Sequence, residues 1–164
     1  MIHRAPRRTP RRALLAALLV ATAACTAPGP RAVSLGREDC GYCRMTVSDA
    51  RFAAEARTAH GRVHVFDSIE CLAGYASATP AGEVRALWVT DHDHPGTFVA
   101  ADSATFWRVS GPASPMGKGL LATAGPPPAG VAEPGAPLRW RDVLALVARE
   151  GLPRGSGGAH GHTD

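Results

Sequence analysis

The most restrictive feature of this chain is its N-terminal segment, which combines an arginine-rich start, a short apolar run and a cysteine. Five arginines and no acidic residue lie within residues 1–12, and residues 13–24 are almost entirely apolar. Such a run is too short to span a bilayer and has the layout of a signal peptide. We therefore expect residues 1–24 to be removed, so that only the remainder contributes to the fold.

Small residues, Ala23 and Ala24, precede Cys25, as is typical of a bacterial lipoprotein processing site. We predict that Cys25 is lipidated and that the protein is exported, anchored to the membrane of the cell envelope by this lipid, and faces the periplasm. The alternative is cleavage after the alanine-rich stretch, which leaves Cys25 as a plain thiol. Residues 25–38 contain proline and glycine without periodicity, and we expect a tether between the lipid and the fold.

Removal of the leader changes the charge of the chain. Five of the 18 basic residues and none of the 14 acidic residues lie in the leader, so 13 basic and 14 acidic residues remain, a formal charge of −1. No basic patch is left to favour a nucleic-acid partner. No nucleophile elbow or phosphate-binding loop is present either, and we do not expect an enzyme.

Turn residues and hydrophobic periodicity divide the rest of the chain into elements of an α+β fold. The first half predicts strands at 51–58 and 62–66 joined at Gly61, a helix capped by Asp67 or Ser68 that runs to about residue 76, and a strand at 83–90. A polar loop comes next, at 91–96. The second half predicts strands at 105–109, 120–124 and 137–140 and an amphipathic helix at 141–150, separated by a Pro- and Gly-rich segment at 125–135.

These elements predict two small related ββαβ-type units that pack together, because neither is large enough to bury much core alone. The first unit covers residues 39–96, and the second, which is degenerate, covers residues 97–150. Residues 151–164 form a Gly- and His-rich tail that we expect to be disordered.

The Cys-x-x-Cys-x-Met motif formed by Cys40, Cys43 and Met45 is the strongest candidate functional site. Thiolates and a thioether are soft donors that prefer Cu(I) to hard divalent ions, and a thioether is a poor ligand for zinc. The motif therefore predicts a Cu(I) site with one ion per chain. A structural disulfide, a reducible thiol pair and a zinc staple remain open alternatives for a Cys-x-x-Cys pair in an exported protein.

Other side chains are secondary candidates. Met116 lies between Pro115 and Gly117 in a loop, a setting that seldom supplies a core methionine, and we consider it a ligand candidate. Cys71 lies on the apolar side of the predicted first helix, where a buried structural cysteine is the simpler interpretation. Four histidines are further candidates for secondary metal binding: His92, His94, His160 and His162.

Taken together, these features resemble the NosL family of periplasmic copper-binding lipoproteins, which assist maturation of nitrous oxide reductase. The resemblance depends on the cysteine after the leader, on Cys-Gly-Tyr-Cys-Arg-Met at 40–45, on Phe-Ala-Ala-Glu at 52–55, on residues 61–65, on Phe-Asp-Ser-Ile-Glu-Cys at 66–71 and on Pro-Met-Gly at 115–117. It covers residues 40–150 and is most specific over residues 40–75.

The resemblance implies two ββαβ-type units and Cu(I) ligands at Cys40, Cys43, Met45 and Met116. It implies a chaperone that serves apo nitrous oxide reductase together with the membrane transporter for its copper and maturation. Two departures stand out: Arg44 replaces the glycine usual in the family, and the segment at 125–135 replaces the helix of the second unit. An envelope thiol–disulfide protein, or a structural lipoprotein with a disulfide or zinc staple, is the competing hypothesis.

Overall fold

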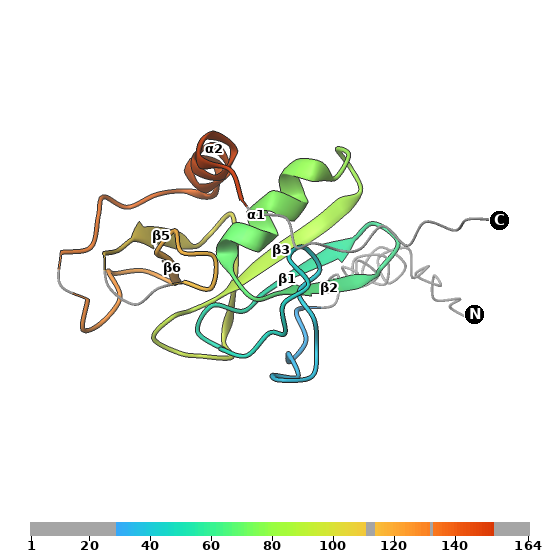
Figure 1. Ribbon diagram of the computed structural model, residues 1–164, viewed down its shortest axis with the longest axis horizontal. Coiled ribbons are helices and arrows are strands. Elements are labelled where there is room, and N and C mark those ends of the chain that lie inside the picture. Colours follow the sequence, from blue (N-terminus) through green and yellow to red (C-terminus); the bar gives the residue numbers. More distant parts are fainter. Residues whose placement is uncertain (1–28, 111–113, 132, 153–164) are drawn as a thin grey trace, which may run out of the picture.

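The computed structural model describes residues 29–110, 114–131 and 133–152, which form two antiparallel sheets and two helices (Figure 1). The larger sheet has the strand order β2-β1-β3-β4, and the smaller sheet pairs β5 with β6. The strands are Ala54–Thr58 (β1), Val63–Phe66 (β2), Val84–Thr90 (β3), Phe98–Ala100 (β4), Thr105–Arg108 (β5) and Leu120–Thr123 (β6). The helices are Ile69–Ala78 (α1) and Trp140–Glu150 (α2). This arrangement confirms the predicted α+β class.

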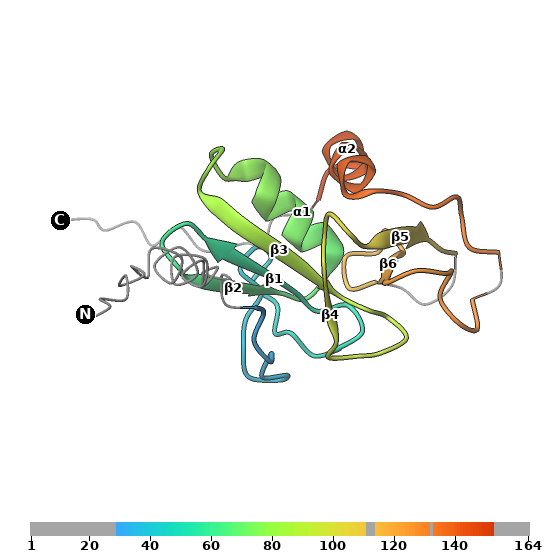
Figure 2. The same cartoon turned by 180° about the vertical axis from the view of Figure 1, so that it is seen from behind.

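The hairpin of β1 and β2 turns at Gly61, as predicted. Gly61 has a φ of 82°, in the left-handed region that glycine adopts without strain. Strand β1 pairs with β2 on one side and with β3 on the other, both antiparallel, so it is an interior strand of the sheet. Helix α1 lies across one face of this sheet in both views of the molecule (Figures 1 and 2).

The opposite face of β1 is partly covered by the segment 29–38, within the stretch expected to be a tether. The backbone N–H of Arg31 donates to Glu55 Oε2 at 3.1 Å, and Arg57 Nη2 donates to the carbonyl oxygen of Gly29 at 2.9 Å. From residue 29 onward the chain is therefore hydrogen-bonded to the fold. Glu55 is fully buried in the middle of β1 as a result, and burial raises the pKa of its carboxyl group.

Helix α1 begins where the sequence predicts it. Of the two candidate caps, Ser68 is the N-cap, and its Oγ accepts a hydrogen bond from the backbone N–H of Cys71 at 3.1 Å. The helix ends at Ala78, slightly beyond the predicted end near residue 76. The cap leaves Asp67, one residue earlier, outside the helix and turned toward the cysteines.

The second half repeats the strand order of the first in a reduced form. Strand β5 pairs with β6, and on its other side Phe106 forms an isolated antiparallel bridge with Leu138. The strand expected at 137–140 is thus a single bridge, because Trp140 already begins α2 and the Asp142 carboxylate accepts a hydrogen bond from the Arg139 N–H at 2.8 Å. No helix occurs in the described part of residues 125–135.

Strand β4 was not predicted. Its three residues show no alternation of polar and apolar side chains. They form a strand because they pair with β3, for example Phe98 with Thr90. Because β4 joins the larger sheet, that sheet extends to Ala100, past the boundary expected after residue 96.

One apolar core joins the two halves. The buried cluster that includes Phe66, Leu72 and the three described cysteines also includes Phe106 and Leu146 of the second half. The two units therefore pack together, as expected from their small size. Within residues 29–110, 114–131 and 133–152, no helix combines the length and the hydropathy that a membrane span requires.

Candidate metal centre

Four buried side chains meet between the Cys-x-x-Cys hairpin and the start of α1. The sulfur atoms of Cys40, Cys43 and Cys71 and a carboxylate oxygen of Asp67 all lie within 4.8 Å of one another. Cys40 and Cys71 are 0% exposed, Cys43 is 5% exposed and Asp67 is 3% exposed. Among the His, Cys, Asp and Glu side chains of the described residues, this is the group that can hold a metal ion.

A short hairpin positions Cys40 and Cys43. The N–H of Cys40 donates to the carbonyl oxygen of Met45 at 2.8 Å, and the N–H of Arg44 donates to the carbonyl oxygen of Cys40 at 3.1 Å. Arg44 has a φ of 67°, a conformation that disfavours side chains other than glycine. The turn therefore favours glycine at this position, and Arg44 adopts a strained backbone conformation there.

Two glycines let this hairpin approach the rest of the fold. A Cβ atom at Gly41 would lie 3.3 Å from the Phe66 ring, and the Gly41 N–H donates to the carbonyl oxygen of Val65 in β2 at 2.8 Å. A Cβ atom at Gly74 in α1 would lie 2.7 Å from the Tyr42 ring. The hairpin is thus held against β2 by Gly41 and against α1 by the Tyr42 ring on Gly74.

Asp67 and Cys71 enter the site from the junction of β2 and α1. The thiol of Cys43 donates a hydrogen bond to Asp67 Oδ2 at 3.4 Å, while Asp67 Oδ1 is buried without a partner. Cys71 is held by the hydrogen bond from its N–H to the Ser68 cap. A buried carboxylate oxygen without a partner is costly, so this atom fits a role as acceptor for a proton or a metal.

The three thiols are not equivalent. The hydrogen bond from the Cys71 thiol lowers the pKa of Cys40 to about 6, and the same bond, with burial, raises the pKa of Cys71. Burial raises the pKa of Cys43 to about 11. At neutral pH the metal-free site therefore holds one thiolate, at Cys40, and two thiols that can lose protons to an incoming metal.

The predicted methionine ligands lie in different surroundings. Met45 shares the hairpin with Cys40 and Cys43, but its side chain is 52% exposed. Met116 is half-buried and packs against the core cluster that contains the three cysteines. The ligand roles of both methionines stay predictions.

The histidine candidates do not join the cysteines. His92 Nδ1 lies 3.3 Å from Asp93 Oδ1, and His94 Nδ1 lies 3.2 Å from Asp91 Oδ2. Both histidines are therefore paired with aspartates of the same loop, at 91–96. Within the part of the chain that the structure describes, these side chains form no group of three metal-ligating side chains. The remaining candidates, Cys25, His160 and His162, lie outside the described residues.

Sequence reasoning treated Asp67 as a helix cap and Cys71 as a secondary candidate. The sequence signal was limited to adjacency: Asp67 directly precedes the Ser68 cap, and Cys71 lies in the first turn after it. That the two side chains face the same point is an observation of the structure, which spacing along the chain does not give.

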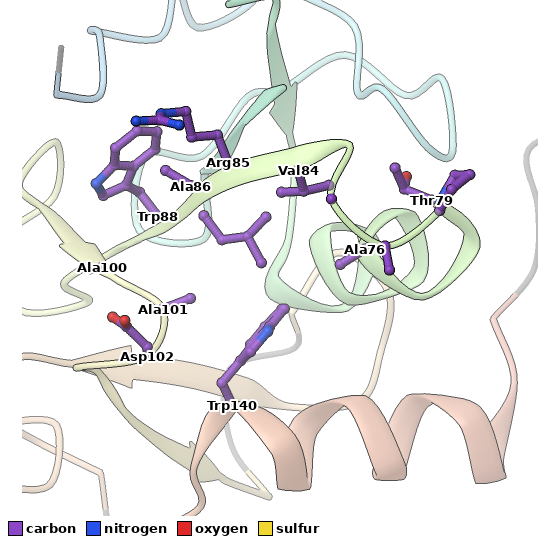
Figure 3. A pocket seen from close by; sticks show the side chains of 14 residues that line it. Ala76, Thr79, Val84, Arg85, Ala86, Trp88, Ala100, Ala101, Asp102 and Trp140 are labelled. Atoms are coloured by element: carbon purple, nitrogen blue, oxygen red, sulfur yellow. The ribbon is translucent and has the colours of Figure 1, made fainter. Parts of the chain in front are cut away.

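A separate pocket of about 400 Å³ lies between α1, β3, β4 and the start of α2 (Figure 3). Its lining is mainly apolar and includes Val84, Trp88 and Trp140, with Arg85 and Asp102 as charged members. It contains no cysteine, methionine or histidine, so it is distinct from the cysteine cluster.

No protein-family model matches this sequence, and no curated protein matches it. Among solved structures, the fold is similar to the crystal structure of the copper chaperone NosL from Shewanella denitrificans, with a TM-score of 0.52 and 17% sequence identity. The match covers 81% of this chain and 98% of that chain. The chain therefore has a NosL-like fold, and a buried cluster of three cysteines and one aspartate lies at the start of its first helix.

Proposed function

We propose that this protein is a Cu(I) chaperone of the cell envelope that delivers copper for the assembly of nitrous oxide reductase. The observation that carries the proposal is the buried cluster of Cys40, Cys43, Cys71 and Asp67 on a NosL-like fold. Three sulfur donors favour a soft ion such as Cu(I). The fold similarity to a copper chaperone supports copper as the cargo of this site.

Within the site, Cys40 offers copper a thiolate, because the hydrogen bond from the Cys71 thiol lowers the pKa of Cys40. As copper–sulfur bonds form at Cys43 and Cys71, these two thiols release their protons. Asp67 already accepts the hydrogen bond from Cys43, so its carboxylate is placed to receive the first of these protons.

Copper enters and leaves on the hairpin side. Cys43 is the most exposed of the three cysteines, and Met45 lies two residues later on the same turn with half of its side chain in solvent. A thioether binds Cu(I) without adding charge or releasing a proton, so it suits a transient contact. Exchange through Met45 and Cys43 passes the ion to ligands of a partner without releasing it to water.

The location and partners of the protein are inferred from the leader and the family resemblance. Lipidation of Cys25 anchors the fold to the membrane on the periplasmic side, where it delivers Cu(I) to apo nitrous oxide reductase with the aid of the enzyme's membrane transporter. Three residues, 26–28, lie between Cys25 and Gly29, where the hydrogen bonds to β1 begin, and the four Cα–Cα steps from Cys25 to Gly29 reach at most about 14 Å. The fold is thus held close to the membrane surface.

A competition titration of Cu(I) against a chromogenic chelator tests this function. The mature chain should bind one Cu(I), and Cys40→Ser, Cys43→Ser and Cys71→Ser should each weaken binding by about 100-fold or more, since each removes a ligand. His60→Ser, at an exposed side chain outside the cluster, is the control and should bind as tightly as the parent protein. Unchanged affinity in all three cluster variants contradicts the proposal.

A structural zinc site is the second candidate, because a Cys₃Asp set suits tetrahedral Zn²⁺ and the Asp67 oxygen is a hard donor. The two ions are distinguished by offering both under reducing conditions and by counting sulfur and oxygen ligands with X-ray absorption. If Zn²⁺ displaces Cu(I) when both ions are at equal concentration, the result favours a structural zinc site.

The low pKa of Cys40, about 6, is also a property of redox cysteines. Cys40 is however fully buried, whereas a catalytic thiol must reach its substrate. A disulfide-exchange assay with a reduced protein substrate should therefore show no turnover, and measurable catalysis that depends on Cys40 supports a thiol–disulfide protein instead.

A further inference from the structure

A buried hydrogen bond joins α1 to the loop at residues 114–119. Glu70 in the first turn of α1 is 0% exposed and Ser114 is 2% exposed, and the Ser114 hydroxyl donates to Glu70 Oε1. The same hydroxyl accepts a hydrogen bond from the Gly119 N–H at 3.0 Å, and the Ser114 carbonyl oxygen accepts one from the Gly117 N–H at 2.8 Å. Ser114 thus organises the loop and attaches it to the residue next to Cys71.

The position of Glu70 is costly for the fold. Its Oε2 atom is buried without a hydrogen-bond partner, and an unsatisfied buried carboxyl oxygen destabilises a protein. A first-turn glutamate on an exposed helix face would avoid this cost and still favour the helix N-terminus. Burial of this carboxyl group therefore points to a requirement other than stability of the fold.

The loop that Glu70 holds contains Met116, two residues after Ser114. The Met116 side chain is half-buried against the core cluster that contains Cys40, Cys43 and Cys71. Gly119 has a φ of 66°, and a Cβ atom there would lie 2.3 Å from the carbonyl oxygen of Val109, so the loop has little freedom to rearrange where it enters β6.

We propose that the hydrogen bond between Glu70 and Ser114 is a positioning contact, which holds the 114–119 loop against α1 so that the Met116 thioether reaches copper bound at the cysteine cluster. This inference rests on the proposed function. Glu70 and Ser114 act through Met116 and are not ligands themselves. A second attachment of the loop, the ion pair between Lys118 and Glu150 at 3.5 Å, is solvent-accessible and has no such role.

The test is a double-mutant cycle for Cu(I) affinity with Ser114→Ala and Met116→Leu. Each single variant should weaken Cu(I) binding by about tenfold, the lower end of the effect of second-shell changes on metal sites. The double variant should bind no more weakly than Met116→Leu alone. X-ray absorption should count one sulfur ligand fewer in Ser114→Ala than in the parent protein.

Two further variants separate positioning from a general structural role. Glu70→Gln keeps an oxygen that accepts the Ser114 hydrogen bond and should retain parental Cu(I) affinity and sulfur count. Lys118→Gln removes the solvent-accessible attachment of the same loop and should also bind normally. If Ser114→Ala does not fold, Glu70→Leu removes the acceptor with a side chain of similar size and is judged by the same cycle.

Different failures have different meanings. If Ser114→Ala weakens Cu(I) binding equally in the parent and Met116→Leu backgrounds, the hydrogen bond does not act through Met116 and the inference is overturned. If Ser114→Ala and Met116→Leu both bind normally while the cysteine variants do not, the inference fails and the proposed function stands. If Cys40→Ser, Cys43→Ser and Cys71→Ser all bind Cu(I) as tightly as the parent protein, the proposed function itself is contradicted.

Discussion

The two halves of the molecule share a strand order but differ in the element that comes after the second strand. In the first half β1 lies between β2 and β3, and in the second half β5 lies between β6 and the bridge at Leu138. After β2 the chain caps and forms α1, which brings Asp67 and Cys71 to the site. After β6 it forms no helix within the described part of residues 124–139, and this half supplies core packing and the Met116 loop.

Local sequence explains the difference. Asp67 and Ser68 come directly after β2, and Ser68 satisfies a backbone N–H at the start of α1. The corresponding stretch after β6 contains three consecutive prolines, 126–128, which lack the N–H groups that a helix requires and restrict the residues before them. The comparison shows that the metal-ligand cluster depends on the helix that follows the second strand of the first half, because α1 and its cap bring Asp67 and Cys71 to the site.

The largest expected effect tests whether the two halves are independent. Phe106→Ala in β5 removes a fully buried ring from the shared core and should lower the free energy of unfolding by about 3–5 kcal/mol. Urea denaturation monitored by both fluorescence and circular dichroism should show one transition, because the core is continuous. Two separate transitions, with only one shifted, would mean that the halves fold independently.

A pH series compares the buried carboxyl group of the first half with an exposed one of the second. Burial raises the pKa of Glu70, so its contribution to stability is present below the unfolded pKa and is lost as the pH rises through the folded pKa. The stability of Glu70→Gln relative to the parent protein should therefore grow with pH above about 4.5, with a limiting slope of about 1.4 kcal/mol per pH unit.

The matched variant is Glu150→Gln in α2, where the hydrogen bond from Arg108 lowers the pKa of the carboxyl group. Its dependence should have the opposite sign: the parent protein loses this contribution as the pH falls through the folded pKa of Glu150. Chemical denaturation at several pH values measures both differences. Parallel curves for Glu70→Gln and the parent protein would contradict the assignment of the raised pKa to Glu70.

The contact between α1 and the cysteine hairpin has no counterpart among the described residues of the second half. Gly74→Ala places a methyl group against the Tyr42 ring and should destabilise the protein by about 1–2 kcal/mol, after the gain in helix propensity is subtracted. Thermal unfolding measures the change. Tyr42→Leu in the same chain removes the clash and should recover the helix-propensity gain; continued destabilisation would show that the ring is not the cause.

The smallest effect concerns the strained turn of the hairpin. Arg44→Gly relieves a positive φ and should stabilise the metal-free protein by about 1 kcal/mol, less the greater entropy of glycine in the unfolded chain. Arg44→Ala keeps the strain and serves as the control for loss of the guanidinium group. Equal stability of the two variants would remove the strain argument.

Much of the local structure in both halves could be predicted from the sequence. The turn at Gly61, the cap at Ser68 and the helix α2 depend on residues close together in the chain, and the structure has all three. Strand β4 could not be predicted, because its order comes from pairing with β3. The exposure of Met45 could not be predicted either, since spacing along the chain does not tell which side of a hairpin faces solvent.

By itself, the sequence determined the secondary structure around the motif and the soft chemistry of Cys40 and Cys43, because caps, turns and ligand types act locally. Only the tertiary structure decided that Asp67 and Cys71 complete the cluster and that Glu70 meets Ser114. The partners in these contacts, Cys43 with Asp67 and Glu70 with Ser114, are 24 and 44 residues apart in the chain. Packing of α1 against the hairpin and the 114–119 loop brings them together, and no local pattern encodes that packing.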